Sequence, residues 1–219
     1  FGKGFFGLNS FTMQMLLVLV TGHILANTKA SHRGINYIIQ KIETPTTAIV
    51  ITTLVSIFIS LINWGFGLIA GAVFAKEVAK KVRDVDYRLL IASAYSGFVV
   101  WHGGLSGSIP LTIATDKHFA IQWMGVVPIS ETLFSPLNLF ILAGLILGLP
   151  LINLLMHPKL ENRVFYKTDE EETYTEEKLP HSFGEKLEHS NWISISICLI
   201  GFYYIIVHFL ANGFKLNLD

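Results

Sequence analysis

The segment Asn63-Trp64-Gly65-Phe66-Gly67 interrupts an apolar stretch of 31 residues that runs from Pro45 to Ala75. One helix of that length would measure about 46 Å, which is too long for the roughly 30 Å hydrocarbon core of a bilayer and too short for two crossings. Asparagine and two glycines in five residues favour a helix break. The stretch therefore predicts two helices that meet at this turn as a re-entrant hairpin, entering and leaving on the same side. A single long, tilted helix is the alternative.

A second apolar stretch, from Leu89 to Thr115, is interrupted by a tract rich in glycine and serine that spans residues 102–110. The helix before this tract would reach only about 20 Å, so the tract should lie inside the bilayer. Ser108 is predicted to cap a new helix that has Pro110 in its first turn. Backbone that is not helical is tolerated at that depth only inside protein or beside a water-filled cavity. We therefore expect a discontinuous span.

Three further apolar stretches, at about residues 5–26, 132–156 and 192–210, each fit one membrane-spanning helix. Pro150 is expected to kink the second of them, because it frees the carbonyl of Ile146. Together with the two interrupted stretches, they predict an all-α integral membrane protein, a polytopic helical bundle with a re-entrant hairpin and a discontinuous helix.

Charged residues divide the chain further. Residues 159–191 hold fourteen of the 32 Lys, Arg, Asp and Glu side chains and read as a polar linker. We expect a membrane domain over residues 1–158, with spans at about 5–26, 89–115 and 132–156 and the hairpin at about 45–75. Residues 192–219 would then begin a further part with one more span.

Composition excludes several classes of protein. Hydrophobic residues make up 52% of the 219 residues and charged residues only 15%, whereas soluble domains carry about 25% charged residues. A soluble enzyme and a disordered chain are therefore excluded. The net charge is zero and no basic patch alternates with aromatic residues, so we expect no nucleic-acid partner. The chain has one cysteine and no CxxC, HExxH or Walker motif, so no catalytic residue, metal or cofactor is predicted.

Positive charges favour the hairpin over a single crossing. With the hairpin, and leaving the linker aside, eight basic residues fall on one side and three, Lys3, Lys117 and Lys215, on the other. The eight are Lys29, Arg33, Lys41, Lys76, Lys80, Lys81, Arg83 and Arg88. Because short cytoplasmic loops carry the excess of Lys and Arg, these eight should face the cytoplasm.

The two interruptions are the candidate site. A helix that begins inside the membrane offers unpaired N–H groups and the positive end of its dipole, which suits an anion. No Lys or Arg lies inside any apolar stretch, so backbone amides, hydroxyls and the Asn63 amide would do the binding, with positive φ angles expected at Gly65, Gly104 and Gly107. The predicted substrate-binding residues are Asn63, Gly65, Gly67, Gly104, Ser106, Gly107 and Ser108.

Other readings of these residues remain open. His102 is a candidate for coupling to a proton or ion, although a histidine hydrogen-bonded to a nearby carbonyl is equally compatible with the sequence. The spacings Gly67-xxx-Gly71 and Gly144-xxx-Gly148 are more typical of helix packing than of ligand contact.

Several motifs resemble the short-chain fatty acid transporter family. They are Met13-Gln14-Met15, Val20-Thr21-Gly22-His23, Ile62-Asn63-Trp64-Gly65-Phe66-Gly67-Leu68, Asp86-Tyr87-Arg88-Leu89-Leu90-Ile91-Ala92, Gly104-Leu105-Ser106-Gly107-Ser108-Ile109-Pro110-Leu111 and Thr132-Leu133-Phe134-Ser135. The resemblance implies multi-pass carriers of the inner membrane, about twice this length, with inverted repeats. The chain would be the N-terminal half of such a carrier. No role for His102 carries over.

This resemblance implies uptake of acetoacetate- or butyrate-like carboxylates. We expect a secondary transporter that is driven by H⁺ or Na⁺. The expected partners are the carboxylate, the coupling ion and the lipid bilayer, and a homo-oligomer is left open. A cation/proton antiporter of the same broad fold is the alternative, against which no Asp or Glu lies inside an apolar stretch. A polytopic membrane enzyme is a weaker alternative, because the stretches lack a nucleophile–base pair or metal cluster.

Overall fold

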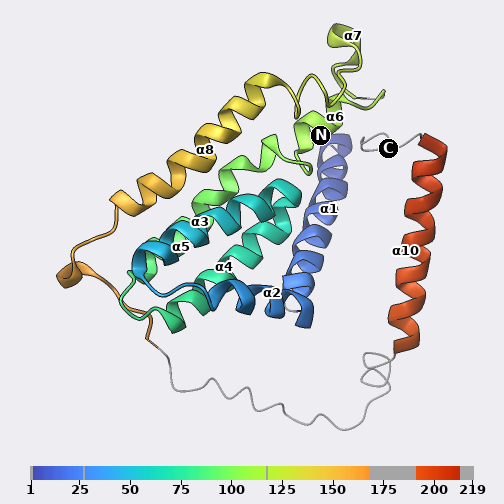
Figure 1. Cartoon of the computed structure of the whole chain (residues 1–219). Coiled ribbons are helices and arrows are strands. Elements are labelled where there is room, and N and C mark those ends of the chain that lie inside the picture. Colours follow the sequence, from blue (N-terminus) through green and yellow to red (C-terminus); the bar gives the residue numbers. More distant parts are fainter. Residues whose placement is uncertain (1, 27, 117, 168–190, 213–219) are drawn as a thin grey trace. The chain divides into compact units, whose positions relative to one another are not determined.

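The computed structural model describes residues 2–26, 28–116, 118–167 and 191–212, and within these ranges every regular element is a helix (Figure 1). The chain forms two compact units, of which the first reaches Lys167 and the second covers Thr168–Asn217. The predicted all-helical fold is confirmed. Most of the predicted linker, and residues 213–219, lie outside the described residues.

The first unit contains all the elements that form the candidate site. They are α1 (Gly2–Ala26), α2 (Lys29–Ile39), α3 (Pro45–Ile62), α4 (Trp64–Lys81), α5 (Tyr87–Ser96), the 3₁₀ helix η1 (Gly97–Gly103), α6 (Ser108–Ile113), α7 (Ile121–Met124), α8 (Pro136–Leu155) and the 3₁₀ helix η2 (Leu160–Asn162). The second unit contributes α10 (Asn191–Asn212).

Three described segments are long and apolar enough to cross a membrane: Pro45–Ile62, Tyr87–Ile113 and Pro136–Leu155. The first is α3, the second joins α5, η1 and α6, and the third is α8. α1 and α10 are continuous helices over the first and last apolar stretches. The architecture is therefore that of a polytopic membrane protein.

α3 and α4 form an antiparallel hairpin in which one residue, Asn63, separates the helices. A Cβ on Gly67 would collide with Ser60, and one on Gly71 would lie 3.1 Å from the Ser56 hydroxyl. Pairs that move apart in sequence on both sides of the turn indicate antiparallel packing. The end of α4 thus returns to the end at which α3 began, and the alternative of one long, tilted helix is excluded.

Local capping residues explain where several helices begin. Thr44 and Thr47 form a reciprocal capping box before α3, whose first residue is Pro45. The Asp86 carboxylate accepts the Leu89 amide at 2.9 Å to start α5, and Ser135 caps α8 in the same way.

The interruption of the second apolar stretch is present, but the predicted boundaries were wrong. The α-helix ends at Ser96 and continues as the 3₁₀ helix η1 to Gly103, and the N-cap of α6 is Gly107 rather than Ser108. A Cβ on Gly97, the first residue of η1, would lie 2.7 Å from the Ile57 amide nitrogen of α3. α3 and η1 therefore approach as closely as their backbones allow.

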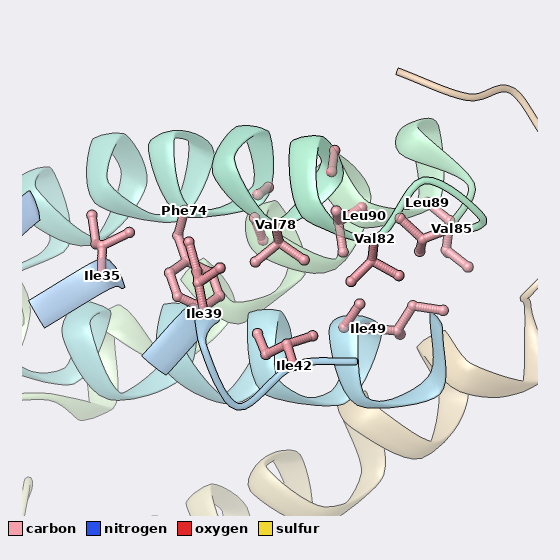
Figure 2. Packing of buried hydrophobic residues seen from close by; sticks show 14 residues of the cluster. Ile35, Ile39, Ile42, Ile49, Phe74, Val78, Val82, Val85, Leu89 and Leu90 are labelled. Carbon is pink, nitrogen blue, oxygen red and sulfur yellow. The ribbon is translucent and has the colours of Figure 1, made fainter. Parts of the chain in front are cut away.

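A hydrophobic core joins α2, α3, α4 and α5 (Figure 2). Ile39 of α2, Ile49 of α3, Phe74 of α4 and Leu90 of α5 are buried in it. The Lys81 ammonium donates to the carbonyls of Ile39 and Gln40, both at 2.9 Å, and so closes the C-terminal end of α2 against α4. α2 is therefore an amphipathic helix packed across the basic end of the hairpin.

The start of the predicted linker packs against the same end of the unit. The Val164 amide donates to Asp86 Oδ2 at 2.7 Å, and the Tyr87 amide donates to the Val164 carbonyl at 2.8 Å. Arg88 Nη2 donates to the Asn162 carbonyl at 2.9 Å. We call this contact between residues 84–88 and 162–166 the clasp.

Candidate functional site

The hairpin turn and the break before α6 lie side by side (Figure 1). The Leu105 amide donates to the Leu61 carbonyl at 2.7 Å, and the Trp64 amide donates to the Ser106 hydroxyl at 3.0 Å. Two segments about forty residues apart in sequence are thus joined by hydrogen bonds at one place. They contain Asn63 and Ser106, two of the predicted binding residues.

Asn63 ends α3 and begins α4. Its backbone is extended, with φ −150° and ψ 119°. Its side-chain oxygen accepts the Phe66 amide at 2.9 Å, and its carbonyl accepts the Gly67 amide at 2.9 Å. The side-chain amide nitrogen donates to no residue that the structure describes. Capping therefore fixes the oxygen and leaves two N–H donors available.

Ser106, like Asn63, has its acceptor engaged and its donor available. Its hydroxyl oxygen accepts the Trp64 amide, while its proton is donated to no residue in the described part of the chain. Both side chains therefore use an acceptor to close the start of α4 and keep a donor. Donors are what a carboxylate requires, because an ionised carboxylate only accepts hydrogen bonds.

The backbone amides at the start of α4 are less available than the sequence suggested. Three of the first four, those of Trp64, Phe66 and Gly67, are already hydrogen-bonded. α6 has only six residues, so its dipole is short. Anion binding at these helix ends would therefore depend on the side chains of Asn63 and Ser106 more than on backbone amides.

The glycines of the break allow close approach, and the expected positive φ angles were wrong. Gly104 and Gly107 have φ angles of −101° and −63°, and Gly65 lies within α4. Gly125 is the one glycine with positive φ among the described residues. A Cβ on Gly104 would lie 2.6 Å from the Leu61 Cα, and one on Gly107 would lie 2.5 Å from the His102 carbonyl oxygen.

The two small-residue spacings differ in the structure. Gly67 and Gly71 lie against Ser60 and Ser56 of α3, so these glycines pack helices within the hairpin. Around Gly144 and Gly148 nothing described would meet an added Cβ within 4 Å.

His102 and the tryptophans lie beside the turn. His102 is exposed, its ring centroid lies 3.6 Å from that of Trp101, and its side chain forms no hydrogen bond with a described residue. Trp101 also contacts Trp64 and Phe98, with ring centroids 5.6 Å apart in each case. The aromatic rings thus shield one side of the turn. Ser108 is half-buried in the first turn of α6.

Asn138 is a residue of the site that the sequence analysis missed. Its side-chain amide donates to the carbonyls of Gly103 at 3.2 Å and Leu133 at 2.7 Å, which fastens the start of α8 to the break. A polar residue three positions after the Ser135 cap, in a helix whose one other polar side chain is Asn153, was the available signal. Among the described residues, no three His, Cys, Asp or Glu side chains gather as metal ligands would.

Comparison with known proteins adds a family to this geometry. The whole chain, residues 1–219, matches the sequence model of the short chain fatty acid transporter family. The chain belongs to this family. This membership confirms the resemblance carried by the motifs, and the family is one of transporters rather than enzymes.

Two curated relatives of the chain carry the same name, "Putative short-chain fatty acid transporter". The Escherichia coli protein is 38% identical over 222 residues, and the Haemophilus influenzae protein is 37% identical over 229 residues. Each alignment covers 100% of this chain but 50% and 51% of the relative. The chain thus spans about half the length of these relatives. No solved structure matches it.

Proposed function

We propose that the complete carrier takes up short-chain carboxylates such as acetoacetate or butyrate across the inner membrane, coupled to H⁺ or Na⁺. The carboxylate head would be bound at the hairpin turn and the break before α6, and Asn63, Gly65, Gly67, Gly104, Ser106, Gly107 and Ser108 remain the candidate residues. One observation carries the proposal. Asn63 and Ser106 lie on adjoining segments, each with its acceptor engaged and its donor available.

The surroundings of these donors suit a small carboxylate. No Lys or Arg is present in α3, in residues 95–115 or in α8, so a carboxylate would be bound by neutral donors. Such binding is moderate in strength, because each hydrogen bond to a charged group contributes about 1.5–3 kcal/mol. Moderate binding suits a carrier, which must release its substrate on the other side.

The hairpin and the half-length match support a two-part carrier. We infer that α3 and α4 form a re-entrant hairpin and that a second half, related to this one by an inverted repeat, completes the site. Carriers with inverted repeats bind substrate near the bilayer midplane, where interrupted helices from both repeats meet. His102, exposed beside the turn, is the candidate for coupling.

Uptake of labelled butyrate by the full-length carrier in vesicles tests the site. Asn63→Asp retains the oxygen that caps α4 but replaces the N–H donors by a negative charge, so uptake should be abolished while the protein folds. Ser106→Ala should raise the apparent KM by about tenfold to a hundredfold, through the loss of one hydrogen bond to a charged group.

Thr44→Ala is the matched control, because it removes a helix cap at the opposite end of α3. Its KM should stay at the parent value. Normal butyrate uptake by both Asn63→Asp and Ser106→Ala would show that the carboxylate binds elsewhere. Uptake driven separately by a Na⁺ gradient and by a pH gradient identifies the coupling ion.

A further inference from the structure

An apolar hollow of about 260 Å³ lies beside the hairpin turn. Its wall includes Leu61 and Ile62 from the end of α3, Leu105 from the break, Phe134 from the loop before α8 and Leu142 from α8. No charged or polar side chain lines it. The side chains of the hollow therefore supply no hydrogen bond to a carboxylate, but they can pack against a hydrocarbon chain.

The same two segments carry the hollow and the donors. Leu61 and Ile62 directly precede Asn63, and Leu105 directly precedes Ser106. The bond from the Leu105 amide to the Leu61 carbonyl ties the two segments together where they form the wall. A ligand whose head is at Asn63 and Ser106 would thus have the hollow beside it.

Backbone contacts give the hollow a definite size. Asn138 fastens the start of α8 to the Gly103 and Leu133 carbonyls, so the wall from α8 cannot move freely away from the break. Gly103 and Gly104 also line the hollow, and a Cβ on Gly103 would lie 2.8 Å from Asn138 Oδ1. Side-chain size at the wall, rather than backbone movement, should therefore decide what fits.

We propose that this hollow takes the alkyl tail of the carboxylate and sets the chain length that the carrier prefers. The inference rests on the proposed function, since it requires a carboxylate head at Asn63 and Ser106. Each methylene removed from water should strengthen binding by about fourfold, until the hollow is full. Leu142 is the residue to vary, because it projects from a continuous helix and forms neither the turn nor the break.

Competition by unlabelled acids against butyrate uptake tests the proposal in the full-length carrier. The series is acetate, propionate, butyrate, valerate and hexanoate. In the parent, the inhibition constant should fall from acetate to butyrate. Leu142→Phe fills part of the hollow. It should raise the inhibition constants of valerate and hexanoate by tenfold or more, and that of acetate least. Leu142→Ala enlarges it and should shift the preference to longer acids. Leu147→Ala, at a 75% exposed position of the same helix, should keep the parent profile.

The outcomes separate the two proposals. Suppose that butyrate is carried and that Asn63→Asp abolishes uptake, but that both Leu142 variants keep the parent chain-length profile. The hollow then faces lipid or the second half of the carrier, and the inference about chain length is overturned. If the parent carries none of these acids, the proposed function itself fails. Leu142→Ala supplies the answer where Leu142→Phe does not fold, since removing side-chain volume creates no clash.

Discussion

Gly104 is the residue at which the two segments of the site approach most closely. Gly104→Ala would drive a methyl group into the Leu61 backbone, 2.6 Å from its Cα, where no side chain can yield. Overpacking of this kind costs about 1–3 kcal/mol or more. We expect a lower unfolding temperature in detergent and loss of butyrate uptake in the full-length carrier.

Gly144→Ala is the matched control, since nothing described lies within 4 Å of its Cβ position. It should leave uptake intact and be neutral or stabilising by up to about 1 kcal/mol, as alanine favours helix. Equal unfolding temperatures for the two variants would mean that Leu61 and Gly104 are not in contact in the folded carrier.

At this scale, the sequence marked the two interruptions but not the hydrogen bond that joins them. Asn63 and Ser106 stood out because they lie at the two interruptions of the apolar stretches. The Asn63 cap is local, but the bond of Ser106 was hidden, because Ser106 accepts from an amide 42 residues away. The glycine tract predicts positive φ angles, whereas Gly104 needs only the absence of a Cβ beside Leu61. A glycine that is required for its turn conformation and a glycine that is required for close packing cannot be told apart in a single sequence.

Among the elements, the clasp joins the start of α5 to the segment after α8 through one carboxylate. Burial of Asp86 acts to raise its pKa, but hydrogen bonds from the Val164 and Leu89 amides and from Arg88 outweigh burial and hold the pKa below its ordinary value. The clasp should therefore stabilise the protein fully above pH about 4, near the ordinary carboxyl pKa. Its contribution should be lost as pH falls through the lower, folded-state pKa.

Asp86→Asn tests the clasp. The variant keeps one oxygen for the Leu89 amide, but its NH₂ group would face the Val164 amide and Arg88, which are also donors. We expect the full-length carrier to lose about 2 kcal/mol of stability at pH 7, the usual size of a hydrogen bond to a charged group. Thermal unfolding from pH 7 to pH 3 should show a smaller acid-induced loss in the variant than in the parent.

Asp84→Asn is the control for this prediction, because only the backbone carbonyl of that exposed residue is used, by Arg163. Its unfolding temperature should follow the parent's at every pH. A parent-like temperature for Asp86→Asn would place the clasp outside the stable part of the fold.

Element boundaries were predictable where their cause is local. A Thr-Pro pair marks the start of α3, and Asn63 and Ser135 mark those of α4 and α8. The end of α5 at Ser96 was not predictable in this way, because the chain continues as η1 with no side-chain cap at that point. The association of α2 with the hairpin was missed because Lys81 reaches carbonyls about forty residues away in sequence.

Over the whole first unit, the basic segments gather at one end. Lys81 bonds the end of α2, Arg88 bonds Asn162, and Arg163 Nη1 donates to the Asp84 carbonyl at 2.7 Å. The antiparallel hairpin returns α4 to this end, next to the start of α3. Because Lys and Arg are retained in short cytoplasmic loops, this end should face the cytoplasm.

Cysteine labelling of the full-length carrier tests this orientation, in a background in which the exposed Cys198 is replaced by serine. Arg33→Cys, Arg83→Cys and Glu161→Cys should each react with an impermeant maleimide only from the cytoplasmic side, because the structure places all three segments at one end. Trp123→Cys, at an 82% exposed position of α7, should react only from the opposite side. Labelling of Arg33→Cys and Arg83→Cys from opposite sides would contradict the hairpin.

Ile62→Cys then separates a re-entrant hairpin from two full crossings. α3 has 18 residues and measures about 27 Å, close to the hydrocarbon thickness, so its length alone allows either arrangement. In a re-entrant hairpin the turn stops within the bilayer, and a bulky impermeant reagent outside should not reach this position. With two full crossings, the 64% exposed Ile62 position would emerge at the outer surface and label as readily as Trp123→Cys. Protection of Ile62→Cys, with Trp123→Cys labelled in the same membranes, is the result we expect.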